Sequence, residues 1–161
     1  MEPKEQSVRP RGKIIALTAH APVIYLISFF LGVLAHYFYP VTFIPKEAAG
    51  IVGSIFLVAG PLLILWSQVS IRRFRREVAA NRDAQIFNIG PYRLTRNPTY
   101  LGLTLLITGF GFLANSLFIV LSGIVGFITV NYTIVRSEES LLREKYGEHY
   151  ERYKEKVRRW L

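Results

Sequence analysis

The sequence predicts an all-α fold, a polytopic membrane protein with about four transmembrane helices and a cytoplasmic amphipathic C-terminal helix. Hydrophobic residues make up 51% of the 161 residues and gather in long blocks. The net charge is +9, and the basic residues flank these blocks instead of interrupting them. A nucleic-acid binder would line a soluble face with its arginines, so the pattern favours a membrane protein with basic ends and no nucleic-acid partner.

Two apolar runs form the N-terminal half. The first predicted span is residues 21–39, which follows a polar and basic start. Such a start can also belong to a signal peptide, but further spans follow and no clear small-residue cleavage site appears, so we interpret this run as a retained span. The second is residues 48–71, where small residues permit close helix packing and Pro61 predicts a kink. We expect it to end at the arginine cluster in residues 72–76.

A polar loop and a helical hairpin follow. Residues 77–98 are the main polar loop, and residues 99–114 are an apolar helix. At 1.5 Å per residue this helix reaches only about 24 Å, less than the hydrocarbon thickness, so it starts in the interface or dips only part of the way across. A turn at Asn115 and Ser116 then leads to the last span, residues 117–135.

Charge and composition bound the remaining possibilities. Positive charge is concentrated in residues 1–13, 72–96 and 136–159, while the intervening loops carry only Lys46. This asymmetry predicts that both termini are cytoplasmic. The chain has no cysteine, which excludes thiolate chemistry, and its three histidines are scattered, so we expect no metal site.

The stretch from Gly90 to Gly102 is rigid, basic and aromatic. Pro91 and Pro98 fix their own φ angles and push the preceding residue away from the α region, so we expect an extended loop that turns at both ends. Arg93 and Arg96 offer planar donor forks suited to a carboxylate or a phosphate. The start of the next helix also favours a nearby anion. A juxtamembrane basic loop with proline stops is the plainer interpretation, and the loop alone leaves both open.

Glu138 and Glu139 leave the last span together. Carboxylates this close to a bilayer are costly unless a cation meets them, and the candidates are Arg136, Arg93, Arg96 or the amino group of a ligand. The pair could form structural ion pairs only. Alternatively, the arginines and the two carboxylates form a pocket with both polarities, which would suit a zwitterion.

The C-terminal segment is predicted to be one helix that continues unbroken out of the membrane. Apolar and aromatic side chains recur in it at steps of three and four. They are Leu142, Tyr146, Tyr150, Tyr153, Val157 and Trp160. Such a helix lies on the cytoplasmic leaflet as an anchor or covers something bound there.

The motif Gly-Pro-Tyr-x-x-x-Arg-x-Pro-x-Tyr-x-Gly in residues 90–102, followed by a hairpin and by Glu138-Glu139-x-x-Leu142, resembles the isoprenylcysteine carboxyl methyltransferase and phospholipid methyltransferase superfamily. The resemblance implies an integral membrane enzyme that takes a methyl group from S-adenosylmethionine and modifies a lipophilic or lipid acceptor. Its cofactor lies between the loop, the hairpin ends and the C-terminal helix. We therefore expect one membrane domain, with two N-terminal spans in residues 1–76 and the catalytic part in residues 77–161.

The resemblance also implies residue roles. The expected cofactor-binding residues are Tyr92, Arg96, Asn97, Pro98, Tyr100, Leu101, Gly102, Glu138, Glu139 and Leu142. The expected catalytic residues are Asn97, Tyr100, Glu139 and Arg93. An amine acceptor must lose a proton, for which Glu139 or Tyr100 could serve, whereas Arg93 or Arg158 could hold an acidic acceptor or a lipid phosphate.

Asn97 leaves the acceptor open. The carboxyl methyltransferase branch usually has histidine at this place, while an Asn-Pro form looks more like the phosphatidylethanolamine methyltransferase branch. Asparagine does not titrate near neutral pH, so it cannot shuttle a proton. The resemblance thus leaves two acceptors open, a prenylcysteine carboxylate and a phospholipid amine. Two alternatives rank lower: an NADPH-dependent membrane reductase of the sterol-reductase kind, for which no further basic pocket is visible, and a non-catalytic membrane adaptor.

Overall fold

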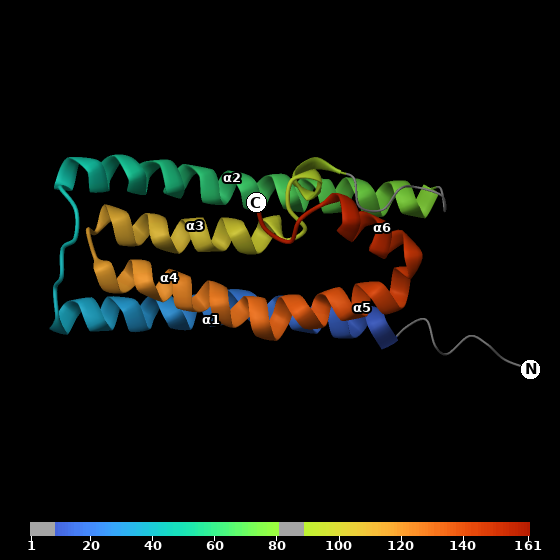
Figure 1. The fold of residues 1–161 in the computed structure, drawn as a ribbon, viewed down its shortest axis with the longest axis horizontal. Helices are drawn as coiled ribbons and strands as arrows, with labels where there is room; N and C mark the ends of the chain where they lie inside the picture. Colours follow the sequence, from blue (N-terminus) through green and yellow to red (C-terminus); the bar gives the residue numbers. More distant parts are fainter. Residues whose placement is uncertain (1–8, 81–88) are drawn as a thin grey trace, which may run out of the picture.

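The computed structural model describes residues 9–80 and 89–161, and every regular element within these ranges is helical. The long helices lie side by side in a bundle (Figure 1). They are α1 (Arg9–Phe38), α2 (Lys46–Ala80), α3 (Pro98–Leu113) and α4 (Leu117–Val130). Helix α3 packs between α2 and α4, and α1 packs mainly against α4. The all-α prediction is thus confirmed for the described residues.

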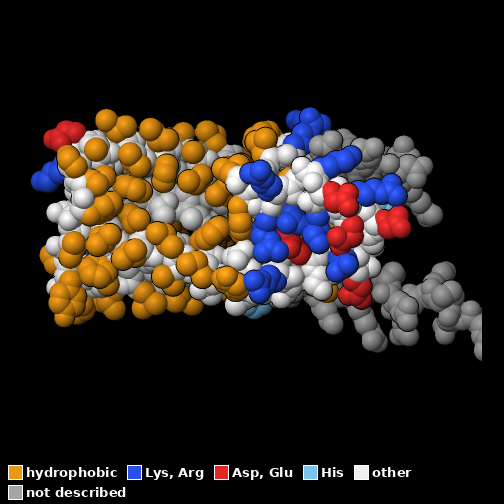
Figure 2. All heavy atoms as spheres, in the orientation of Figure 1, with side chains coloured by type: hydrophobic (Ala, Val, Ile, Leu, Met, Phe, Trp, Pro, Cys, Tyr) orange, Lys and Arg blue, Asp and Glu red, His pale blue; other side chains and the backbone are white. Residues whose placement is uncertain are grey.

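Three described segments are long and apolar enough to cross a membrane. They are His20–Phe38, Lys46–Phe74 and Leu117–Tyr146. Helix α3 is apolar but has only 16 residues, so the predicted count of four spans stays a prediction. Hydrophobic side chains cover most of the visible face of the bundle, and most of the charged side chains gather at one end (Figure 2). So much exposed apolar surface fits lipid contact and would be unfavourable in water.

Glycines let α2 and α3 approach each other closely. A Cβ atom on Gly60 would lie 2.7 Å from the carbonyl oxygen of Gly102, and one on Gly109 would lie 2.9 Å from the backbone nitrogen of Leu57. Close backbone approach through small residues is typical of helix pairs in membranes. The prediction of small-residue packing on α2 is confirmed for Gly60, whereas a Cβ on Gly50 would meet nothing within 4 Å.

The turn between α3 and α4 is tied to the loop between α1 and α2. Asn115 has a φ of 48°, and its Nδ2 donates to the carbonyl oxygen of Ile44 at 2.8 Å. Ser116 caps α4 by accepting from the backbone nitrogen of Ile119 at 3.3 Å. The predicted turn at these two residues is confirmed. This turn links the two helix connections at the end of the bundle opposite the main group of charged side chains.

Helix α2 runs past the predicted end of the second span at Ile71, through the arginine cluster and on to Ala80. The predicted end concerns the membrane boundary, and the helix continues beyond it because a charge cluster does not stop a helix. Glycine and proline are absent from residues 62–89, and arginine is a good helix former. The predicted polar loop is shorter accordingly, and its residues 81–88 lie outside the described part of the chain.

The loop before α3 is not extended throughout. Gly90–Arg93 form a turn of 3-10 helix, η1, with Gly90 at a φ of 54°. The fixed φ of Pro91 suits the first position of a helical turn as well as an extended strand, and the turn prevails. A Cβ on Gly90 would lie 2.1 Å from Ser70 Oγ, so only glycine fits against α2 here.

The C-terminal segment contains two helices where we predicted one. The chain continues from α4 through a turn of π-helix, η2 (Asn131–Val135), into α5 (Arg136–Tyr146) without a break, as expected. Gly147 then ends α5 with φ 53° and ψ −128°, and α6 (Glu148–Lys156) folds back towards the bundle (Figure 1). The aromatic stripe is therefore divided, and Tyr150, Tyr153 and Val157 pack with residues of α5.

We expect Gly60→Ala to destabilise the bundle, because its methyl group would push α2 away from the backbone of α3. Overpacking of this kind costs about 1–3 kcal/mol, and each kcal/mol lowers the melting temperature of a chain of this size by roughly 2–4 °C. Thermal unfolding in detergent measures the shift. Gly50→Ala is the matched control in the same helix, and it should leave the melting temperature unchanged or raise it slightly. Equal melting temperatures for the two variants would contradict this account.

We expect Gly147→Ala to loosen α6. No atom lies within 4 Å of the added Cβ, so the cost comes from the backbone conformation alone, about 1–3 kcal/mol. Hydrogen–deuterium exchange should rise across α6 and stay the same in α3 and α4. A uniform increase over the whole bundle would show instead that Gly147 supports global stability.

Candidate functional site

The C-terminal segment lies against the loop before α3. The backbone nitrogen of Arg96 donates to the carbonyl oxygen of Arg158 at 3.0 Å, and Thr95 Oγ1 donates to that of Arg159 at 2.7 Å. Asn97 Nδ2 makes a longer contact of 3.5 Å with the same Arg159 oxygen. Two stretches about sixty residues apart in sequence are therefore joined by one backbone–backbone hydrogen bond and by two hydrogen bonds from side chains to a backbone oxygen.

Helix α6 contributes a second tie to this loop. The Tyr153 hydroxyl donates to the carbonyl oxygen of Tyr92 at 2.8 Å. Burial raises the pKa of Tyr153, and burial together with the charge of Glu139 raises that of Tyr150. Both phenols therefore stay protonated at neutral pH, and Tyr153 acts as a donor. Of the two roles considered for the C-terminal segment, a membrane anchor and a cover over a bound molecule, this arrangement favours the cover.

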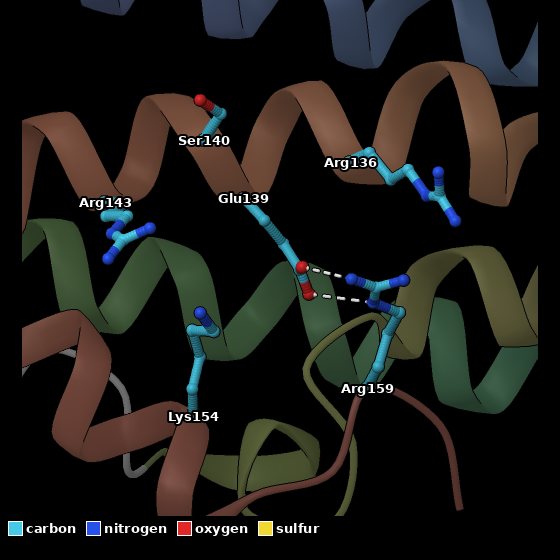
Figure 3. Close-up of a pocket in the computed structure, with 6 residues that line it drawn as sticks. All are labelled: Arg136, Glu139, Ser140, Arg143, Lys154 and Arg159. Atoms are coloured by element: carbon cyan, nitrogen blue, oxygen red, sulfur yellow. Dashed lines mark hydrogen bonds and ion pairs between the residues drawn. The ribbon is translucent and has the colours of Figure 1, made fainter.

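The centre of the site is the Glu139 carboxylate. Arg159 donates to it through two nitrogens, Nε at 3.1 Å and Nη2 at 2.5 Å (Figure 3). Arg96 Nη1 lies 3.2 Å from Glu139 Oε1 on another side. The side chains of Glu139 and Arg96 are only 12% and 11% exposed, so both charges are largely removed from water. The hydrogen bonds to Glu139 raise the pKa of Arg159 further.

Glu138 has a different partner. Its Oε2 accepts from the Tyr100 hydroxyl at 2.9 Å. Tyr100 is buried, and its carbonyl oxygen accepts from the hydroxyl of Tyr25 on α1 at 3.2 Å. Helix α3 therefore presents Tyr100 to α5 at the level where Glu138 begins the polar part of that helix.

Arg96 keeps unused hydrogen-bonding capacity. Its Nε and Nη1 are buried and have no hydrogen-bond acceptor among the described residues, although Nη1 lies within ion-pair distance of Glu139. Buried donors normally have an acceptor, and an unsatisfied one costs about 1–3 kcal/mol. A ligand carboxylate or phosphate beside Arg96 would supply the missing acceptor.

The structure brings together most of the polar residues that the sequence predicted. Arg96 and Asn97 are linked to Glu139, the first directly and the second through Arg159, and Tyr100 forms a pair with the adjacent Glu138. The N-terminal residue of α3 is the buried Pro98, and the half-buried Tyr92 and Leu101 lie on either side of it in sequence.

Three predicted residues lie elsewhere. Arg93 ends η1 with an exposed side chain. Leu142 packs against the aromatic cluster of α6. Gly102 faces α2, because a Cβ there would lie 2.6 Å from Ile64 Cγ1, and so it serves the packing of α3.

Sequence reasoning missed Arg159 and Thr95. Arg159 follows the end of α6, where Val157 is already extended at φ −125° and ψ 126°. Outside a helix, no periodicity distinguishes Arg159 from Arg158. Thr95 is buried in the loop, and only its place inside the Gly90 to Gly102 motif could have drawn attention to it.

A pocket of about 370 Å³ adjoins the site (Figure 3). Its lining side chains come from α5, from α6 and from the segment after α6. They are Arg136, Glu139, Ser140, Arg143, Lys154 and Arg159. Most of them are cationic, so the pocket is suited to an anion.

The fold and the site define a helical membrane protein with a charged cluster at one end of the bundle. The model of the Phospholipid methyltransferase family matches residues 48–149, nearly two thirds of the chain. The chain therefore belongs to the phospholipid methyltransferase family, a family of membrane methyltransferases, which confirms the resemblance drawn from the two motifs. A relative from Haemophilus influenzae, described as an uncharacterized protein, is 41% identical over 63 residues, which are 38% of this chain and 98% of the relative. No solved structure matches the chain.

We expect Glu139→Gln to release the C-terminal segment, because the amide leaves two guanidinium groups without their carboxylate. Breaking a largely buried ion pair costs about 3 kcal/mol or more. Hydrogen exchange at the Arg96 amide, which donates to Arg158, should rise more than tenfold, since about 1.4 kcal/mol corresponds to a factor of ten. Glu148→Gln, which removes an exposed carboxylate paired with Arg152, is the control and should leave that amide protected. Similar exchange in both variants would contradict the role assigned to Glu139.

Proposed function

We propose that this chain is an S-adenosylmethionine-dependent methyltransferase that acts on a membrane-embedded, lipid-like acceptor. The observation that supports this most is the meeting of two motifs distant in sequence. Glu138 and Glu139 contact Tyr100 and Arg96, respectively. Family membership supports methyl transfer in general, and the charged cluster supplies a place for the donor.

The residues of the cluster fit the amino-acid end of the proposed donor. That end carries a carboxylate and an ammonium group, and the cluster offers both opposite charges. Arg96 has buried donors that find no acceptor in the described part of the chain, which suits the carboxylate. Among the described residues Glu138 has one donor, Tyr100, and its carboxylate can accept further hydrogen bonds from the ammonium group or from ribose hydroxyls. Asn97, buried at the start of α3, adds an amide that can donate and accept.

When bound, S-adenosylmethionine supplies a methyl group on a sulfonium, which needs no further activation. The remaining work of this chain is to align the two reactants and keep water out. In this proposal Arg96, Asn97 and Glu138 bind and orient the donor, and the C-terminal segment closes the site from outside. In this proposal the acceptor reaches the site from the membrane, beside the apolar surface of the bundle.

The proposed acceptor is a phospholipid amine, which the family description favours over a prenylcysteine carboxylate. An amine must lose a proton before its nitrogen can attack, so a proton acceptor is needed. Glu138 is proposed as the final proton acceptor, and the Tyr100 hydroxyl, which donates to it at 2.9 Å, is proposed to relay the proton by taking it up while passing its own proton to Glu138. Glu139 has both oxygens bound by guanidinium groups, so we assign it the positioning of Arg96 instead. The charge asymmetry supports a cytoplasmic position for this end.

Calorimetry with the detergent-solubilised chain tests the proposal. We expect S-adenosylmethionine to bind, and Glu138→Gln and Asn97→Ala to weaken binding about tenfold each, because a hydrogen bond to a charged group contributes about 1.5–3 kcal/mol. Glu155→Gln, which removes an exposed carboxylate on α6, is the control and should bind as the wild type does.

Two results would overturn the proposal. Wild-type protein that does not bind S-adenosylmethionine excludes the proposed donor, and binding unchanged in both site variants excludes the proposed site. A thermal-shift comparison adds a further arm: stabilisation by NADPH and not by S-adenosylmethionine would favour the reductase alternative.

A further inference from the structure

The basic pocket beside Glu139 carries more positive charge than its surroundings neutralise. Arg143 and Lys154 share one carboxylate, that of Glu151, at 2.9 Å and 3.1 Å. Arg136 lies over the ring of Tyr132 at 4.3 Å, and no carboxylate among the described residues forms an ion pair with it. Arg159 and Arg96 likewise share one carboxylate, that of Glu139. The pocket therefore has an excess of cations.

The proposed methyl donor cannot balance this excess. S-adenosylmethionine carries one carboxylate, one ammonium and one sulfonium, so its net charge at neutral pH is positive. In the proposed function, its single carboxylate binds beside the nitrogens of Arg96 that have no acceptor among the described residues. The group that complements the pocket is a second ligand with a net negative charge.

The position of the pocket narrows the nature of that anion. Arg136 is the first residue after η2, where the apolar surface of α4 ends. Figure 2 shows that the charged end of the bundle begins directly beside its hydrophobic surface. Tyr132, one turn before Arg136, is 57% exposed, and tyrosine is typical of the membrane interface. The pocket therefore lies at the level of the lipid head groups.

We propose that this pocket binds the phosphate of a membrane lipid head group. The guanidinium groups of Arg136 and Arg143 can each donate in pairs to phosphate oxygens, Lys154 adds a point charge, and Ser140 adds a hydroxyl donor. A volume of about 370 Å³ lies within the range of small-ligand sites. The inference rests on the proposed function in that it names the phosphate subsite of the acceptor. It replaces the expectation that Arg93 or Arg158 holds this phosphate.

The test compares two double variants that each remove one charge from α5 and one from α6. Arg136→Gln with Lys154→Gln removes two pocket cations. Lys145→Gln with Arg152→Gln removes two exposed cations that do not line the pocket. Arg159 is left intact because it also holds Glu139. Calorimetry on the full chain in a non-ionic detergent, with no methyl donor present, measures binding of dihexanoyl phosphatidylglycerol, dihexanoylglycerol and inorganic phosphate.

We expect the phosphatidylglycerol to bind more tightly than the other two ligands. The pocket variant should weaken its binding about tenfold, and the control variant less than about twofold, because charge-assisted hydrogen bonds are lost only in the first. Equal weakening in the two variants would overturn the proposal, since it would show general charge attraction. If dihexanoylglycerol bound as tightly as the phosphatidylglycerol, the pocket would not require a phosphate. If inorganic phosphate bound as tightly as the phosphatidylglycerol, the ligand would not need to be a lipid.

The outcome is separable from that of the proposed function. Binding of S-adenosylmethionine to the pocket variant should match the wild type, because Arg96 and Glu138 are unchanged. A wild-type chain that binds the anionic lipid but not S-adenosylmethionine would contradict the methyltransferase proposal and support the phosphate site. A chain that binds S-adenosylmethionine but shows no preference for the phosphate-bearing lipid would contradict the phosphate site alone.

Discussion

Glu139 receives two guanidinium groups from opposite ends of the C-terminal half of the chain. Arg96 comes from the loop before α3, and Arg159 comes from the segment after α6. Coulomb attraction between charges this poorly solvated is much stronger than at a surface, and losing one partner leaves the others uncompensated. This one carboxylate therefore joins the C-terminal segment to Arg96 at the edge of the pocket, in addition to the hydrogen bonds that link the segment and α6 to the loop.

The bundle supplies the rigid base for that interaction. Helix α3 is short, and it carries Tyr100 and the preceding loop at a height fixed by its glycine contacts with α2. Glycines at such contacts allow one axial position only, since any sliding brings a backbone against another side chain. The polar loop thus meets α5 at a defined level. Among the described residues no hydrogen bond links α2 directly to Glu138 or Glu139, so α2 acts on the site through its packing with α3 and η1.

Features governed by local chemistry could be predicted from the sequence. Hydropathy located the long helices, Pro98 marked the start of α3, and Asn115 with Ser116 marked a turn. The charge of Glu139 required a cation, and Arg96 was among those considered. Features governed by tertiary contact could not be predicted. A glycine inside a helical pattern is often tolerated, so Gly147 gave no sign of the break between α5 and α6. Arg159 lies beyond the last helical periodicity, where only the fold decides which side chain turns inward.

The π-helical turn from Asn131 to Val135 has a consequence for how this part of the chain can vary in length. Each residue of an α-helix advances the side-chain direction by about 100°, so one residue added to or removed from a helix rotates everything after it by that angle. A π-helical turn accommodates one extra residue without breaking the helix. Losing a residue there would turn Glu138 and Glu139 towards another side of the bundle. An insertion or deletion harmless in a loop would thus separate the two halves of the site while leaving every one of its residues in the sequence.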